Sequence, residues 1–179
     1  MTKTEYDYIV VGAGSAGAVL SNRLSESGEY KVLCLEAGTE GSDYFWPRVP
    51  IGMAKLINRP AVNWCFSSEP DEGSGGRRIP IPRGKMLGGS SSINGMVFVR
   101  GQPQDYDHWA QSGNRGWSYS DVLPIFKKMG SYDGGSDETR GRDGILRVTD
   151  EAPDICPLHE RMVAAAEKIG TPYTKDYNG

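Results

Sequence analysis

The 179-residue chain contains only two histidines and three cysteines, has no long apolar run and carries no block of basic residues. Nothing approaches the roughly 18 consecutive apolar residues of a membrane-spanning helix, and the polar start Met1–Asp7 does not predict a signal peptide. Because the net charge is −3 and no basic cluster alternates with aromatic residues, we expect no nucleic-acid partner. The cysteines Cys34, Cys65 and Cys156 are widely spaced and odd in number, so we expect buried thiols in the reducing cytoplasm, with neither disulfides nor a metal site.

A glycine-rich loop follows a short apolar run near the amino terminus. Residues 7–12 predict a buried parallel strand that is covered on both faces. In the loop, Gly12 permits a tight turn, Gly14 lacks the Cβ that would block a pyrophosphate, and Gly17 lets the next helix approach the strand. That helix is expected at about residues 15–27, and its free first-turn amides and positive dipole end can hold a pyrophosphate without a lysine.

A second strand, expected at residues 31–36, ends in Glu36, which lies 19 residues after Gly17. A carboxylate at this position can accept hydrogen bonds from the hydroxyls of a ribose, and it repels a 2′-phosphate. The pattern therefore predicts a dinucleotide site and disfavours a phosphorylated nicotinamide cofactor. The intervening helix is expected to face the core with Ala16, Val19, Leu20 and Leu24.

The rest of the sequence predicts alternating extended and helical segments, which indicates an α/β fold. Glycine and proline mark the turns between these segments, and Ser118 with Asp121 is predicted to cap a helix. The expected elements are a short helix at 51–57, extended segments at 63–69 and 77–82, helices at 102–112 and 118–128, a strand at 144–149 and a helix at 157–169.

The stretch Arg83–Gly101 is the most informative part of the sequence. Its glycines allow close backbone approach, and its serines and Asn94 offer short polar groups, so it can wrap a large planar ligand with backbone amides. The plainer reading is a glycine–serine linker. It is disfavoured because seven apolar residues, from Met86 to Val99, are interleaved through the stretch.

This stretch resembles the first signature of the glucose–methanol–choline (GMC) oxidoreductase family. The matching residues run from Gly84-Lys-Met-Leu-Gly-Gly-Ser-Ser through Asn94, Phe98 and Gly101 to Asp107. The segments Asn63-Trp-Cys, Arg100–Trp109 and Gly116–Lys128 resemble the choline-dehydrogenase branch. The resemblance implies that residues 1–179 form the amino-terminal portion of a Rossmann-like FAD-binding domain, incomplete in this chain, with the start of an α+β substrate domain after about residue 150.

The family binds FAD and oxidises alcohols to aldehydes by hydride transfer to flavin N5. The resemblance implies that Ser15, Ala16 and Glu36, with the neighbouring Ala37, hold the ADP half. The resemblance also implies that a second set of residues lines the flavin side: Leu87, Gly88, Ser91, Asn94, Gly95, Met96 and Val97. Weaker candidates are Arg83, Met86 and Trp64, although a tryptophan such as Trp64 is more often a core residue. Ile93 occupies the position at which some members attach FAD through a histidine, so the resemblance implies non-covalent FAD.

No catalytic residue is predicted within the chain. The family uses a histidine as base, beside a second histidine or an asparagine, because the pKa of histidine lies near working pH. The only histidines here, His108 and His159, lie in no catalytic motif and are expected to be structural or solvated. The resemblance therefore implies that the base belongs to a carboxyl-terminal part of a chain about three times as long.

Several functions remain open from the sequence. The first is an FAD-dependent dehydrogenase or oxidase of a small alcohol, seen as a fragment; a flavin lyase or light-driven decarboxylase keeps the cofactor and changes the reaction. A truncated FAD-binding product, or one piece of a split enzyme with a second chain supplying the rest, is a non-catalytic reading. An NAD-dependent dehydrogenase is disfavoured by residues 83–101. Because strands at 7–12 and 31–36 alone leave unpaired edges and exposed apolar faces, we expect residues 1–179 by themselves to be unstable or to aggregate.

Overall fold

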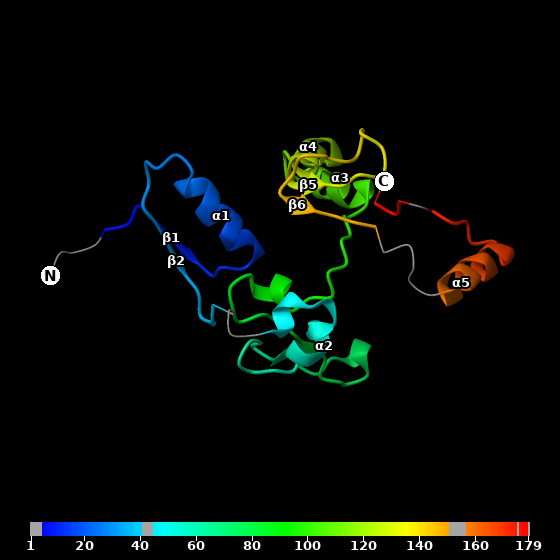
Figure 1. The fold of residues 1–179 in the computed structure, drawn as a ribbon, viewed down its shortest axis with the longest axis horizontal. Coiled ribbons are helices and arrows are strands. Elements are labelled where there is room, and N and C mark those ends of the chain that lie inside the picture. The colour runs from blue at the N-terminus through cyan, green and yellow to red at the C-terminus, as the bar shows by residue number, and fades with distance from the viewer. Residues whose placement is uncertain (1–4, 41–44, 151–156, 175, 179) are drawn as a thin grey trace. The chain divides into compact units, whose positions relative to one another are not determined.

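The structure is a computed structural model that describes residues 5–40, 45–150, 157–174 and 176–178 (Figure 1). The chain folds into two compact units, Met1–Val97 and Phe98–Gly179. Both units combine helices with short strands. The expected α/β class is therefore found as a mixed α/β arrangement, and the division at residue 97 is one that the sequence pattern does not predict.

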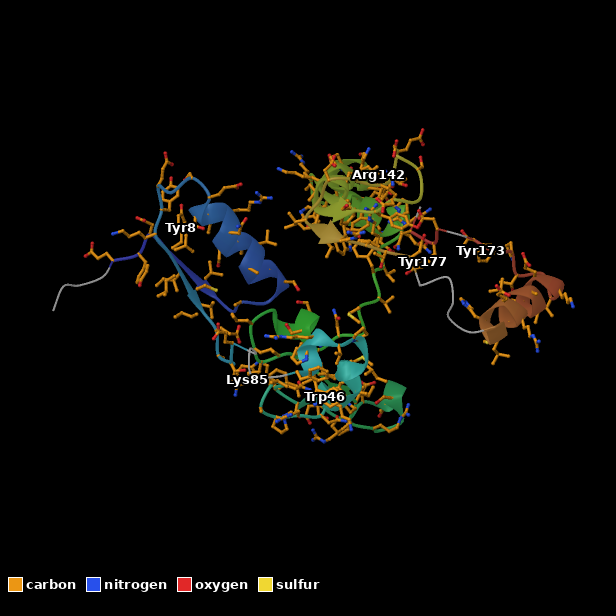
Figure 2. All side chains as sticks on the ribbon, viewed as in Figure 1. Tyr8, Trp46, Lys85, Arg142, Tyr173 and Tyr177 are labelled. Atoms are coloured by element: carbon orange, nitrogen blue, oxygen red, sulfur yellow. The ribbon has the colours of Figure 1, made fainter. Side chains whose placement is uncertain are left out.

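The first unit begins with the predicted strand–helix–strand motif. Strand β1 (Tyr8–Val11) pairs in parallel with β2 (Val32–Leu35), and helix α1 (Ser15–Ser25) connects them and packs on both. The ring of Tyr8 meets that of Tyr30 edge-on at a centroid distance of 5.2 Å (Figure 2). Parallel pairing needs a crossover of this length, so the βαβ reading of the sequence is confirmed.

The described residues do not cover this motif on both faces, so the first strand is not fully buried and the strands leave apolar faces exposed, as expected for these strands alone. Val10 is buried, but Ile9 and Val11 are 61% and 83% exposed. On α1, Val19 and Leu20 are about half exposed, although we expected them to face the core. A single helix can cover only one face of a two-stranded sheet, which leaves the remaining apolar side chains in contact with solvent.

The rest of the first unit is built around a small apolar core. Leu56, Val62, Met86 and Ile93 are buried together, and Trp46 packs against them. The predicted helix at 51–57 is shorter than expected: α2 covers Met53–Leu56, preceded by the 3-10 turns η1 (Trp46–Arg48) and η2 (Pro50–Gly52). The two predicted extended segments pair as an antiparallel ribbon of β3 (Phe66–Ser67) and β4 (Pro80–Ile81), with the 3-10 turn η3 (Glu72–Ser74) between them.

The described residues of the second unit form three helices and a short parallel strand pair. Helices α3 (Pro103–Gln111) and α4 (Tyr119–Met129) contact each other, and β5 (Gly130–Ser131) pairs with β6 (Leu146–Arg147). Helix α5 (Pro157–Lys168) follows. The predicted capping of α4 is confirmed, since the Ser118 hydroxyl accepts the amide of Asp121 and the Asp121 carboxylate accepts the amide of Ser118. The predicted strand at 144–149 is reduced to two residues.

A buried ion pair ties two distant segments of the second unit together. The guanidinium of Arg140, which is 4% exposed, donates to both carboxylate oxygens of Asp176. The Tyr132 ring lies 5.0 Å from the Arg140 guanidinium, and its hydroxyl donates to Asp150. Next to Asp176, the Asn178 amide bonds to the backbone of Phe98 and Arg100.

The cysteines are not buried as expected. Cys34 and Cys65 are both exposed and free, and Cys156 lies outside the described residues. Cys34 belongs to β2, in which Leu35 is also exposed, and the sequence neighbours of Cys65, Trp64 and Phe66, are exposed as well. None of the helices that the structure describes is both long and apolar enough to cross a membrane.

Candidate cofactor-binding site

The amino-terminal glycine loop has the conformation that its sequence predicts. Gly12 has a φ of +93°, which favours glycine, and its amide donates to the Leu35 carbonyl at 2.7 Å. A Cβ on Gly17 would lie 1.8 Å from the Gly12 carbonyl oxygen, so any side chain there would clash with the backbone. Gly12 and Gly17 thus bring the start of α1 close to the end of β1.

Gly14 differs from these two glycines because no protein atom crowds it. A Cβ at Gly14 would meet nothing closer than the Cα of Gly89, at 3.8 Å. The first amide of the helix region with an acceptor is that of Ala18, which donates to the Gly14 carbonyl at 2.9 Å. Among the described residues, no acceptor takes the amides of Ser15 and Ala16, both of which are exposed. An open position beside free amides fits an anionic group such as a pyrophosphate.

Glu36 lies beside this loop, as the sequence predicts. One carboxylate oxygen accepts the amide of Ala13 at 2.8 Å, and the other accepts the amide of Gly38 at 2.9 Å. The side chain is part-buried, and the next residue, Ala37, is exposed. Each carboxylate oxygen retains a lone pair that a ribose hydroxyl can use. Glu36 therefore fastens the loop itself and is also placed to meet a sugar.

The structure brings the two glycine-rich stretches of the sequence together. The Gly88 amide donates to the Ala13 carbonyl at 2.8 Å, and a Cβ on Gly89 would lie 2.9 Å from the Cα of Gly14. Nearby, the Leu87 amide donates to the Thr39 carbonyl at 3.0 Å. Ala13 and Gly88 are 75 residues apart in the sequence, yet their segments form one continuous backbone surface.

The second stretch turns sharply where it meets the loop. Gly88 and Gly89 have φ values of +85° and +56°, and a 3-10 turn, η4 (Gly89–Ser92), follows. The hydroxyl of Ser91 donates to the Gly88 carbonyl at 2.6 Å, and that of Ser92 donates to the Leu87 carbonyl at 2.7 Å. These serines hold the turn in shape, and their oxygens can still accept a hydrogen bond.

The residues after this turn expose apolar side chains. Leu87, Met96 and Val97 are 45%, 59% and 76% exposed. Met96 has a φ of +59°, and its amide donates to the exposed Asn94 side chain at 2.9 Å. At Gly95, a Cβ would lie 3.3 Å from the sulfur of Met53. Exposed apolar groups beside polar backbone fit a flat ring with polar edges.

Two residues of the stretch point inward instead. Met86 and Ile93 are 2% and 4% exposed and belong to the core cluster. Met86, a candidate for cofactor contact, is therefore almost entirely buried in the described fold. Ile93 carries no nucleophilic atom.

The weaker candidates Arg83 and Trp64 lie at the start of the stretch. The Arg83 guanidinium is exposed and donates to the Pro82 carbonyl at 2.7 Å. Trp64, for which a core position was the ordinary expectation, is 45% exposed and stacks on Phe66 with an interplanar angle of 8°. The ammonium group of Lys85, which is labelled in Figure 2, lies 4.7 Å from the centroid of the Trp64 ring.

The sequence comparison names Asn63 only within the Asn63-Trp-Cys segment and gives it no role, but it is 2% exposed and organises the start of the second stretch. No local signal distinguishes it from a surface asparagine, because its partners are backbone groups up to 20 residues away. The histidines behave as expected: His108 on α3 and His159 on α5 are exposed. No cluster of potential metal ligands occurs in the described part of the chain.

The site has the features of a dinucleotide-binding protein, and comparison with known proteins agrees with this class. Residues 6–179 match the sequence profile described as GMC oxidoreductase. The chain belongs to the GMC oxidoreductase family.

Individual relatives share nearly all of this chain. It is 45% identical over 175 residues to an oxygen-dependent choline dehydrogenase of Brucella anthropi, covering 98% of the chain and 32% of the relative. The crystal structure of pyridoxine 4-oxidase from Mesorbium loti is similar with a TM-score of 0.88 and 33% identity, over 97% of this chain and 34% of that one. An FAD-dependent oxidoreductase from Chaetomium thermophilum has a TM-score of 0.78 and 29% identity, over 98% and 31%. The chain spans about a third of the length of these relatives.

Proposed function

We propose that this chain supplies the FAD-binding part of an oxidoreductase that acts on the CH–OH group of a small alcohol. The observation that carries the proposal is the contact between the two glycine-rich stretches, through Gly88 and Ala13 and through Gly89 and Gly14. It joins an anion-binding helix start to a surface suited to a flat ring. Family membership supports FAD as the ligand.

The pyrophosphate, the ribose and the flavin ring of FAD each have fitting residues in this arrangement. The amides of Ser15 and Ala16, with the open position at Gly14, suit the pyrophosphate, and Glu36 suits the ribose. The flavin ring is expected along Leu87–Val97, where the apolar side chains of Leu87, Met96 and Val97 are exposed. Bound FAD supplies a hydride acceptor, flavin N5; the chain's own residues bind and orient it.

We further propose that the FAD is held without a covalent bond. Ile93, at the position where the family resemblance puts an attachment histidine in some members, is buried and aliphatic. Acid denaturation of the full-length protein is therefore expected to release all its flavin into the soluble fraction. Flavin retained on the precipitated polypeptide would refute non-covalent binding.

A quaternary-ammonium alcohol such as choline is the first substrate to test, because choline dehydrogenases are among the relatives. We expect the proton-accepting base to lie outside residues 1–179. The two histidines of the chain, His108 and His159, are exposed on α3 and α5, and neither belongs to the glycine-rich stretches. The chain's part in the reaction is to bind and orient the hydride acceptor.

Anaerobic mixing of the full-length protein with alcohols tests the reaction. We expect one alcohol in a panel headed by choline to bleach the visible flavin band and to yield one aldehyde per flavin reduced. The matched control is the corresponding methyl ether, which has no hydroxyl proton to lose. A flavin that no alcohol reduces, but that promotes a lyase or light-driven decarboxylation, would contradict the proposed reaction while leaving the cofactor intact.

A further inference from the structure

Asn63 is a polar side chain in a nearly dry position of the first unit. It is 2% exposed and adjoins Val62, which belongs to the apolar core. Its side-chain oxygen accepts the amide of Cys65 at 2.9 Å and that of Arg83 at 2.8 Å, and its side-chain nitrogen donates to the Ile57 carbonyl. One buried amide group thus satisfies three backbone groups from different parts of the chain.

These bonds hold the point at which the second glycine-rich stretch begins. The Trp64 amide donates to the Arg83 carbonyl at 2.9 Å, and the Lys85 amide donates to the Val62 carbonyl at 2.8 Å, on either side of an antiparallel bridge between Asn63 and Gly84. The backbone amide of Arg83 bonds to the Asn63 side chain. Without this acceptor, a part-buried amide in the middle of the pairing would lose its partner.

Backbone packing connects the segment that Asn63 holds, around Arg83 and Gly84, to the amino-terminal glycine loop. A Cβ on Gly84 would lie 2.1 Å from the Gly89 carbonyl oxygen, and the Gly84 amide donates to the Ser90 hydroxyl. Gly89 in turn lies against Gly14. The contacts of Gly84 with Gly89 and of Gly89 with Gly14 join backbone to backbone, so a shift at Arg83 moves the backbone that meets the loop.

We propose that Asn63 is a positioning residue of the flavin site: it fixes the start of the Arg83–Val97 stretch and thereby the surface on which FAD is held. The inference depends on the proposed function, since it assumes that this stretch binds FAD. The chemistry requires an asparagine. A carboxylate of the same length can accept both amides but cannot donate to Ile57, and an aliphatic side chain of similar size makes none of the three bonds.

The test compares Asn63→Leu and Asn63→Asp with the matched control Asn58→Leu, all in the full-length holoprotein. Asn58 is exposed and lies five residues away. The readouts are the rate of FAD release, followed by flavin fluorescence, and the visible circular dichroism of the bound flavin, which reports the ring's surroundings.

We expect Asn63→Leu to speed FAD release about tenfold or more and to change the flavin dichroism, because two buried amides lose their acceptor. Asn63→Asp, which keeps both acceptors, is expected to lie between Asn63→Leu and the wild type. Asn58→Leu is expected to match the wild type. A folded Asn63→Leu variant that equals Asn58→Leu in both readouts would overturn the proposal.

If Asn63→Leu does not fold, Asn63→Asp decides. This variant lacks only the donation to the Ile57 carbonyl. A folded Asn63→Asp variant with the release rate and dichroism of the wild type would overturn the positioning role. Wild-type protein that binds no flavin would instead overturn the proposed function, so the two failures are distinguishable.

Discussion

At the scale of the residue, Gly14 and Gly17 separate what the loop needs for folding from what it needs for binding. Gly17 is required by the protein's own backbone, because a Cβ there would lie 1.8 Å from the Gly12 oxygen. Gly14 has a φ of −77°, which any residue adopts, and an added Cβ would have its nearest neighbour at 3.8 Å. Nothing in the described fold explains a glycine at position 14, whereas a bound pyrophosphate does.

Gly14→Ala and Gly17→Ala are therefore expected to differ in the full-length protein. Gly14→Ala should keep the thermal stability of the flavin-free protein and weaken FAD binding about tenfold or more, because its methyl group occupies the ligand's space. Gly17→Ala should lower the stability of the flavin-free protein as well. Calorimetry without FAD and a fluorescence titration with FAD measure the two effects; equal loss of stability in both variants would refute the distinction.

A second prediction at this scale concerns the carboxylate of Asp176. Hydrogen bonding to Arg140 lowers the pKa of Asp176 below its ordinary value of 3.8, although partial burial opposes the shift. A carboxyl with a lowered folded-state pKa contributes stability that is complete above its unfolded value and is lost as the pH falls through the folded value. We expect Asp176→Asn to destabilise the protein near neutral pH, with a deficit that shrinks below pH 3.8.

Urea unfolding of the full-length protein across this pH range measures the deficit, with Asp133→Asn at an exposed carboxylate as control. The control should show no comparable pH-dependent deficit. An Asp176→Asn deficit that stays constant down to acid pH would show that the ion pair is not its source.

Single residues also show how far the sequence could predict the site. The roles of Gly12, Gly17 and Glu36 follow from local spacing, and the structure places all three where that spacing requires. Asn63 and Arg140 are different, because their partners lie 20 and 36 residues away and are chosen by the fold. Residues of this kind carry no pattern that a single sequence can show.

At the scale of the element, the bounds of helices α3, α4 and α5 are predicted to within one residue at each end. Helix α4 was expected at 118–128 and is found at Tyr119–Met129, because Ser118 and Asp121 fix its start locally. The strand expected at 144–149 shrinks to Leu146–Arg147, since the extent of a strand depends on the length of its partner, here the two residues of β5. The start of a helix is determined by neighbouring residues, whereas the length of a strand depends on a partner that is distant in the sequence.

The capping pair yields a prediction for this element. Ser118→Ala removes the acceptor for the Asp121 amide and should cost the first turn of α4 about 1 kcal/mol, or roughly fivefold faster hydrogen exchange at its amides. Asp121→Ala should have a similar effect, and the double variant should cost less than the sum, because the two side chains cap reciprocally. Additive effects, or exchange unchanged in Ser118→Ala, would contradict a reciprocal cap.

At the scale of the whole molecule, the first unit exposes the apolar faces of its βαβ motif. Ile9, Val11 and Leu35 are between 48% and 83% exposed, and the described residues offer no further strand for β1 or β2. The chain spans about a third of its relatives' length. The sequence predicts that these strands need covering, because two strands alone leave edges and apolar faces open. It does not predict which residues cover them, because the strands carry no information about their partners.

We therefore expect residues 1–179, expressed alone, to aggregate or to bind a hydrophobic dye strongly, in contrast to the full-length protein. Size-exclusion chromatography with light scattering, together with dye fluorescence, makes the comparison. A monomeric 19.5 kDa product that unfolds cooperatively and binds no dye would show that the exposed faces need no cover.

The most direct measurement is an experimental structure of the full-length protein with FAD. We predict the pyrophosphate at the amides of Ser15 and Ala16, the ribose at Glu36, and the flavin ring along Leu87–Val97 with no bond to the polypeptide. FAD bound elsewhere, or ring density joined to a side chain, would contradict the assignment of this site.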